Sequence, residues 1–135
     1  MCHFIEGYGN DAPFELAYLV LPLVLREESR SALCRLNKTS TIYSAFLDGK
    51  EKRIRITALQ YYVQAYKGYV NPSLIIYSKK GNEFGLTLKN LNSYDYSKEK
   101  DKTTKAYFKA AYCLGAVFSK EKTPDCFYKL GVFKI

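Results

Sequence analysis

The residues best suited to specific chemistry form a polar stripe in the middle of the chain. They alternate at spacings of four and three residues, which places them on one face of a helix: Arg53, Thr57, Gln60, Gln64 and Lys67. Side chains of these types contact base edges and phosphates in the major groove of DNA. The stripe therefore predicts a helix that faces DNA or a partner protein, and the alternative is an ordinary solvated helix face.

A second basic feature is the pair Lys79 and Lys80, which stands between the β-rich runs SLIIYS and EFGLTL. Two such runs joined by Lys-Lys-Gly-Asn predict a hairpin with a basic tip. Beside the stripe, this tip would contact the DNA backbone. Charged hairpin tips also protect sheets from aggregation, so the alternative is a purely protective role.

Residues for catalysis or metal binding are scarce. His3 is the single histidine, and we expect it to lie in a frayed chain end. The four cysteines have no CxxC spacing and are expected to be buried free thiols, because a metal site begun by Cys2 and His3 lacks a second ligand pair. The acids are interleaved with lysines, and neither a P-loop nor a strand-linked GxGxxG pattern occurs. We therefore predict a protein that is not an enzyme, with no catalytic, metal-binding or cofactor-binding residues.

The formal charge of +8 arises from 21 Lys and Arg against 13 Asp and Glu. Such a balance attracts DNA, RNA or an acidic protein surface, and charge alone does not choose among them. The 13 tyrosines indicate half-buried rings, which are common at interfaces.

The element at the centre of the fold is predicted by the apolar run LAYLVLPLVL, from Leu16 to Leu25. A helix needs about 20 apolar residues to cross a membrane, so a run of this length is typical of a buried core helix. Its flanks carry acids and lack the pattern of a secretory signal. We expect a core helix kinked by Pro22, in a cytoplasmic protein without a membrane span.

Other helices are predicted around this element: one over residues 27–36, one that starts at Thr39 or Ser40, and the helix of the polar stripe from about Glu51 to Tyr69. Gly68 and Asn71-Pro72 are read as the stop of that last helix. The hairpin follows, then a mobile charged loop over residues 90–105, a final helix pair and a docked apolar tail. Three helices followed by a hairpin are typical of a winged helix. The predicted fold is mainly α with a small β-hairpin (α+β), a winged-helix-like core plus C-terminal helices, in a single domain over residues 1–135.

Three segments together resemble one protein family. They are FELAYLVLPLVLREESRSAL, the TSTIYSAFL helix followed by the long helix and NPSLIIYS, and KAAYCLGAVFSKEKTPDCFYKLGVFKI. This order and these apolar motifs are similar to those of the middle component of bacterial ABC-three-component and Lamassu-type systems, which defend against phages and plasmids.

The resemblance implies a non-catalytic adaptor that bridges an SMC-like or ABC-type ATPase and an effector, often a nuclease, in a complex that responds to foreign DNA. It assigns no catalytic residue to this chain. Double-stranded DNA inside such a complex would be a further partner. The alternative from the residues alone is a free-standing winged-helix protein that binds DNA through the polar stripe.

Overall fold

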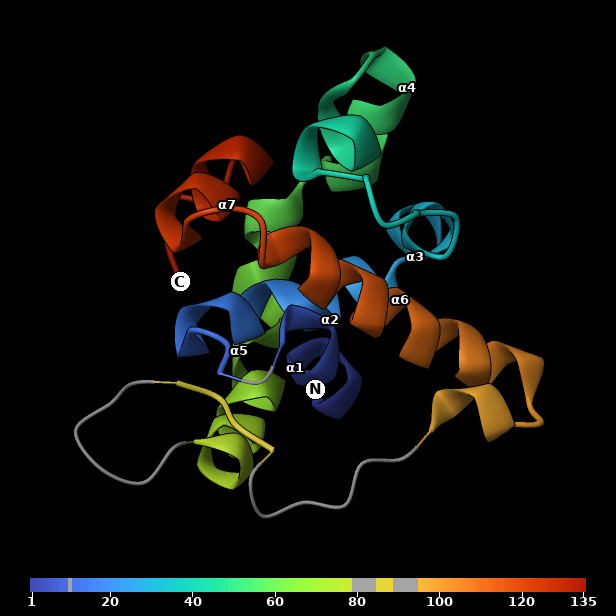
Figure 1. Ribbon diagram of the computed structural model, residues 1–135. Coiled ribbons are helices and arrows are strands. Elements are labelled where there is room, and N and C mark those ends of the chain that lie inside the picture. Colours follow the sequence, from blue (N-terminus) through green and yellow to red (C-terminus); the bar gives the residue numbers. More distant parts are fainter. Residues whose placement is uncertain (10, 79–84, 89–94) are drawn as a thin grey trace.

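The chain forms a largely helical structure, seen in a computed structural model that describes residues 1–9, 11–78, 85–88 and 95–135 (Figure 1). Its α-helices are α1 (Cys2–Tyr8), α2 (Ala17–Leu25), α3 (Glu27–Leu33), α4 (Lys50–Arg53), α5 (Leu59–Tyr77), α6 (Lys102–Phe118) and α7 (Thr123–Leu130). Short helical turns connect them: η1 (Phe14–Leu16), the π-helical turn η2 (Tyr43–Leu47), η3 (Ile54–Ile56) and η4 (Tyr96–Lys98). No strand occurs within these described ranges. The predominance of helix confirms the α part of the predicted fold class.

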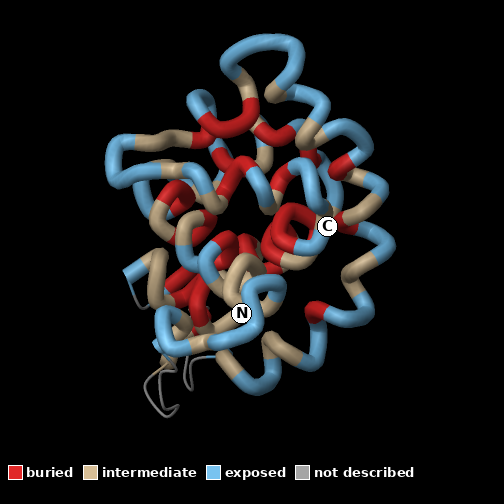
Figure 2. The backbone as a smooth tube through the Cα atoms, turned by 90° about the vertical axis from the view of Figure 1, so that its right-hand side faces the viewer, coloured by how far each residue is buried: buried red, intermediate tan, exposed pale blue. Residues whose placement is uncertain are grey.

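Helix α2 lies at the centre of the fold, as the apolar run predicted. It packs against α3, α5 and α6, and Pro22 lies inside it. Its last turn ends against α3, where the Ser29 hydroxyl donates to the Leu23 carbonyl at 2.5 Å and Arg30 donates to the Leu25 carbonyl at 2.7 Å. These bonds satisfy carbonyl groups that a helix end leaves without partners. Figure 2 shows the buried residues gathered at the centre of the molecule.

Helices α1 and α6 cross at very short range because each carries a glycine at the crossing. A Cβ atom on Gly7 would overlap the backbone carbonyl of Tyr112, and a Cβ atom on Gly115 would overlap that of Phe4. The missing side chains let the two backbones touch directly, and Phe4 and Phe118 then meet edge to face with ring centroids 6.1 Å apart. This contact joins the two ends of the described chain.

The predicted hairpin is wrong in its first strand, because residues 73–77 are the last turn and a half of α5. The buried positions Leu59, Val63 and Val70 recur at helical spacing, and the partly buried Leu74 and Tyr77 extend this row against the core. The stabilisation gained by burying this row of side chains outweighs the loss of the one backbone hydrogen bond that Pro72 cannot form. The proposed tip residues Lys79 and Lys80 lie outside the described residues.

The winged-helix prediction is also wrong. Leu86, from the predicted second strand, forms isolated antiparallel bridges with Ala12 and with Ser78. Its backbone N–H and C=O are both bonded to Ala12, at 2.7 and 3.1 Å. The extended segment therefore pairs both with the chain after α1 and with the end of α5, where the Thr87 N–H donates to the Tyr77 carbonyl at 2.8 Å, and the described residues contain no wing beside a recognition helix.

The predicted charged loop over residues 90–105 is shorter than expected, because α6 begins at Lys102. Asp101 caps this helix, and its carboxylate accepts from the Thr104 N–H at 2.6 Å. The Lys105 ammonium donates to the Ser97 carbonyl in η4 at 3.0 Å, which ties the preceding turn to the helix. Residues 89–94 lie outside the described part of the chain.

No helix among the described residues is both long and apolar enough to cross a membrane.

Candidate interaction surface

The polar stripe is divided between two helices and the turn that joins them. Arg53 ends α4, Thr57 lies in the turn after η3, and Gln60, Gln64 and Lys67 lie on α5. The predicted helix over about residues 51–69 breaks at Ala58, whose φ of 58° is left-handed. A left-handed residue ends the helical register, so Arg53 does not share a helix face with Gln60.

The left-handed turn is held by Arg26, which sequence reasoning did not single out. Its guanidinium donates to the Thr57 carbonyl at 2.9 Å and lies 4.7 Å from the centre of the Tyr62 ring. A cation over an aromatic face is attracted by the ring quadrupole. Arg26 directly follows the apolar run in sequence, and this position at the end of α2 is the signal that could have marked it.

Gln60 and Gln64 bind the C-terminal tail. Both side-chain amides donate to the Lys134 carbonyl, at 2.6 and 2.7 Å. The Gln60 oxygen also accepts from the backbone N–H of Phe133 at 2.7 Å and of Lys134 at 3.1 Å. These contacts confirm the prediction of a docked tail, whose Val132 is buried. The two amides that the stripe offered for base recognition are therefore engaged within the fold.

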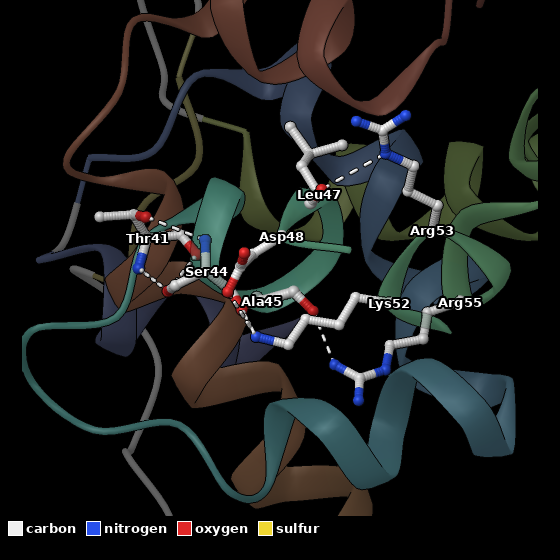
Figure 3. Close-up of polar contacts among 8 residues, drawn as sticks. All are labelled: Thr41, Ser44, Ala45, Leu47, Asp48, Lys52, Arg53 and Arg55. Carbon is white, nitrogen blue, oxygen red and sulfur yellow. Dashed lines mark hydrogen bonds and ion pairs between the residues drawn. The ribbon is translucent and has the colours of Figure 1, made fainter. Parts of the chain in front are cut away.

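Three cationic side chains that follow the π-helical turn donate hydrogen bonds to carbonyl groups of that turn, as Figure 3 shows. Lys52 donates to the Ser44 carbonyl at 2.9 Å, Arg53 to that of Leu47 at 3.3 Å and Arg55 to that of Ala45 at 2.8 Å. Helix ends leave such carbonyl groups without partners and carry partial negative charge, so cations stabilise them. Arg53 therefore has a structural contact in addition to any contact with an external anion.

The start of the same turn is capped by a reciprocal pair of hydrogen bonds. The Thr41 backbone N–H donates to the Ser44 hydroxyl at 2.9 Å, and the Ser44 backbone N–H donates to the Thr41 hydroxyl at 3.2 Å (Figure 3). The predicted cap at Thr39 or Ser40 is therefore shifted to Thr41. With both ends held, the segment from Thr41 to Arg55 forms a basic unit at the N-terminal side of α5.

The outer face of α5 is uncharged and exposed. We use this name for Tyr61, Ala65, Gly68, Tyr69, Pro72, Ile75 and Ile76, all of which are exposed. Tyr61 and Tyr69 are 70% and 72% exposed, and Ile75 and Ile76 are 81% and 63% exposed. Lys67 is the single charged residue in α5, and it is half-buried. The buried side of α5 is formed by Leu59, Val63 and Val70, whereas Gln60 is half-buried and Gln64 is exposed beside the tail.

The histidine is buried, and of the four thiols that we expected to be buried only that of Cys126 is, the others being half-buried. His3 is buried, contrary to the frayed end that we expected; its Nδ1 lies 2.9 Å from a Glu6 carboxylate oxygen and its ring 4.6 Å from that of Phe108. Burial raises the pKa of the Cys126 thiol to about 12 and also raises those of Cys34 and Cys113. These three thiols are therefore protonated and weakly nucleophilic at neutral pH. No group of His, Cys, Asp and Glu within the described residues could hold a metal ion.

Comparison with known proteins gives one match. The family model for "ABC-three component (ABC-3C) system Middle Component 3" matches residues 1–134. No curated protein and no solved structure matches the chain.

Proposed function

Because the chain belongs to the Middle Component 3 family of ABC-three component systems, we propose that it is a non-catalytic adaptor that joins the ATPase component of such a system to its effector component. The match over residues 1–134 is the observation that carries this proposal. Under this proposal the ATPase partner is SMC-like or of the ABC type, the effector belongs to a class that is often a nuclease, and the complex responds to foreign DNA in the cytoplasm.

The chemistry of the side chains supports an adaptor. The His3 ring is packed against Phe108 and paired with Glu6, which leaves it poorly placed to exchange protons with a substrate in solution. The raised pKa of the Cys126 thiol opposes its use as a nucleophile. The exposed tyrosines of the outer face, by contrast, are of the residue type that dominates protein interfaces.

A free-standing winged-helix DNA-binding protein is not favoured. That hypothesis required Gln60 and Gln64 to face DNA from one helix that also carried Arg53. The two glutamines instead bind the Lys134 carbonyl, and Arg53 lies on a different helix. Under our proposal, DNA contacts form in the assembled complex, where the charge of +8 adds a salt-dependent attraction to phosphates.

Co-expression with the products of the neighbouring genes tests the proposal. The purification tag belongs on the ATPase component, because the C-terminal tail of this chain is bound by Gln60 and Gln64. We expect the chain to co-elute with the ATPase and the effector in size-exclusion chromatography at a fixed ratio. Elution of the 15.5 kDa chain alone, at every ionic strength tried, would show that it is not a subunit of such a complex.

A further inference from the structure

The outer face of α5 is long and continuous, and its exposed residues recur at helical spacing. A helix of 19 residues is about 28 Å long, and the exposed positions 61, 65, 69, 72 and 76 recur at spacings of four, four, three and four. These are the spacings at which one helix presents anchors to another. A Cβ atom added at Gly68 would meet nothing within 4 Å, so the face is open at this position.

The composition of this face is unusual for a solvated helix. The protein carries 25% charged residues, yet the outer face has none. Taking about 200 Å² for a fully exposed tyrosine and about 100 Å² for a fully exposed isoleucine, and scaling each by its exposed fraction, the four large side chains present roughly 430 Å². The largest apolar patch on a typical monomer covers about 300–600 Å² and is often functional, and the outer face falls in this range.

Charge distinguishes the possible occupants. The segment that leads into α5 carries Lys50, Lys52, Arg53 and Arg55 against Asp48 and Glu51, and Figure 1 places α4 beyond the N-terminal end of α5. A second copy of this chain would bring a charge of +8 against another +8. Two such patches would also bury only about 900 Å² in total, which is below the roughly 1,200–2,000 Å² of a standard stable interface.

An acidic partner protein would carry a charge opposite to that of this chain and could bury additional area beyond the outer face. Its apolar surface would cover the tyrosines and isoleucines, and its acids would extend the interface beyond α5 onto the basic segment around α4, with the missing area supplied there. Burying tyrosines at the centre and leaving charges at the rim is the usual arrangement of a specific protein interface.

We propose that the outer face of α5 is the docking surface for an amphipathic helix of another component of the same three-component system, with an apolar face flanked by acidic residues. This inference rests on the proposed function and adds the surface and the chemistry of the partner. Tyr61 and Tyr69 are the central anchors, the open position at Gly68 receives an apolar side chain of the partner helix, and Lys50 lies toward the acidic flank.

The test uses the full chain co-expressed with the ATPase and effector components, and compares Tyr69→Ala with Tyr128→Ala. Both tyrosines are exposed on helices, at 72% and 77%, so the pair differs in location and not in the type of truncation. We expect Tyr69→Ala to weaken binding at least about 30-fold, the effect of an interface hot spot, and Tyr128→Ala to leave it within about twofold. Circular dichroism confirms that both variants are folded.

A second variant keeps the inference testable if Tyr69→Ala affects the fold. Ala65→Arg places a charge in the middle of the outer face, at an exposed helical position that tolerates arginine. It should abolish binding while the melting temperature stays unchanged. Lys50→Glu should slow association and flatten its dependence on salt, whereas Lys109→Glu, at an exposed position of α6, should do neither.

The outcomes separate this inference from the proposed function. If the wild type assembles and both Tyr69→Ala and Ala65→Arg assemble as well, the docking surface is wrong and the proposed function stands. If the wild type binds no component, both are wrong. A dimer of the isolated chain in light scattering that Tyr69→Ala dissociates would show that a second copy occupies the face, and would overturn the inference.

Discussion

Replacing Gly115 by alanine should destabilise the protein, although the same change normally stabilises a helix. Alanine in a helix interior is favoured over glycine by about 1 kcal/mol. At position 115, however, the new Cβ would overlap the Phe4 carbonyl and would also lie 2.7 Å from the Tyr8 backbone nitrogen. These neighbours are backbone atoms of α1 that cannot rotate away, so the whole helix must move outward from α6.

The size of the effect follows from that displacement. Overpacking a well-filled core costs about 1–3 kcal/mol, and the upper end applies here because backbone has to shift. Subtracting the gain in helix propensity leaves a net loss of about 2 kcal/mol. For a domain of this size, we expect the melting temperature to fall by roughly 8 °C.

Gly68→Ala is the matched control, because it makes the same chemical change in α5 where nothing lies within 4 Å of the new Cβ. It should raise stability by about 0.5–1 kcal/mol. Urea unfolding followed by circular dichroism measures both variants. If Gly115→Ala is as stable as Gly68→Ala, α1 and α6 do not cross at the distance described, and the argument for this crossing is wrong.

Two further predictions concern the tail and a buried thiol. Gln60→Ala removes the bonds to Phe133 and Lys134 and should cost about 1 kcal/mol, with faster hydrogen exchange in the last residues; unchanged exchange would show that the tail is held in another way. The pKa of the Cys126 thiol is raised to about 12 in the fold, against about 8.5 for a solvated thiol, so the unfolded chain loses this proton first as the pH rises. The free energy of unfolding should therefore fall by roughly 1 kcal/mol between about pH 9 and pH 10 through this thiol, and urea titrations of Cys126→Ala should show a correspondingly smaller fall.

The central helix could be predicted from sequence because its signals are local. The run from Leu16 to Leu25 is apolar on nearly every side, so its burial did not depend on knowing its neighbours. The last helix could be predicted equally well, because Pro124 lies near its start and Gly131, with a φ of 71°, ends it.

The candidate site could not be predicted, because long-range contacts decide it. Arg26 fixes the turn at Thr57 from 31 residues away, and Gln60 bonds to a carbonyl 74 residues away. Neither of these contacts can be recognised from the local sequence pattern. The polar residues have the predicted spacing, but the break at Ala58 divides them between two helices, and the tail engages both glutamines.

The extent of α5 shows how tertiary packing overrides local signals. Asn71-Pro72 and the β-branched Ile75 and Ile76 favoured a stop and a strand. Leu74 and Tyr77 nevertheless pack against the core cluster that also contains Val70, and this requires the helix to continue. Pro72 is exposed on the outer side, where water can satisfy the carbonyl that its ring leaves unbonded.

The crossing of α1 and α6 has a consequence for the order in which the protein is made. Helix α1 is synthesised well before α6, the helix against which it packs. At 5–20 residues per second, Phe4 and Ile5 wait for roughly 5–20 s before α6 emerges from the ribosome to cover them. Nascent chains therefore expose these apolar side chains during the synthesis of all the residues between α1 and α6, and transiently exposed apolar surface of this kind is what chaperones protect.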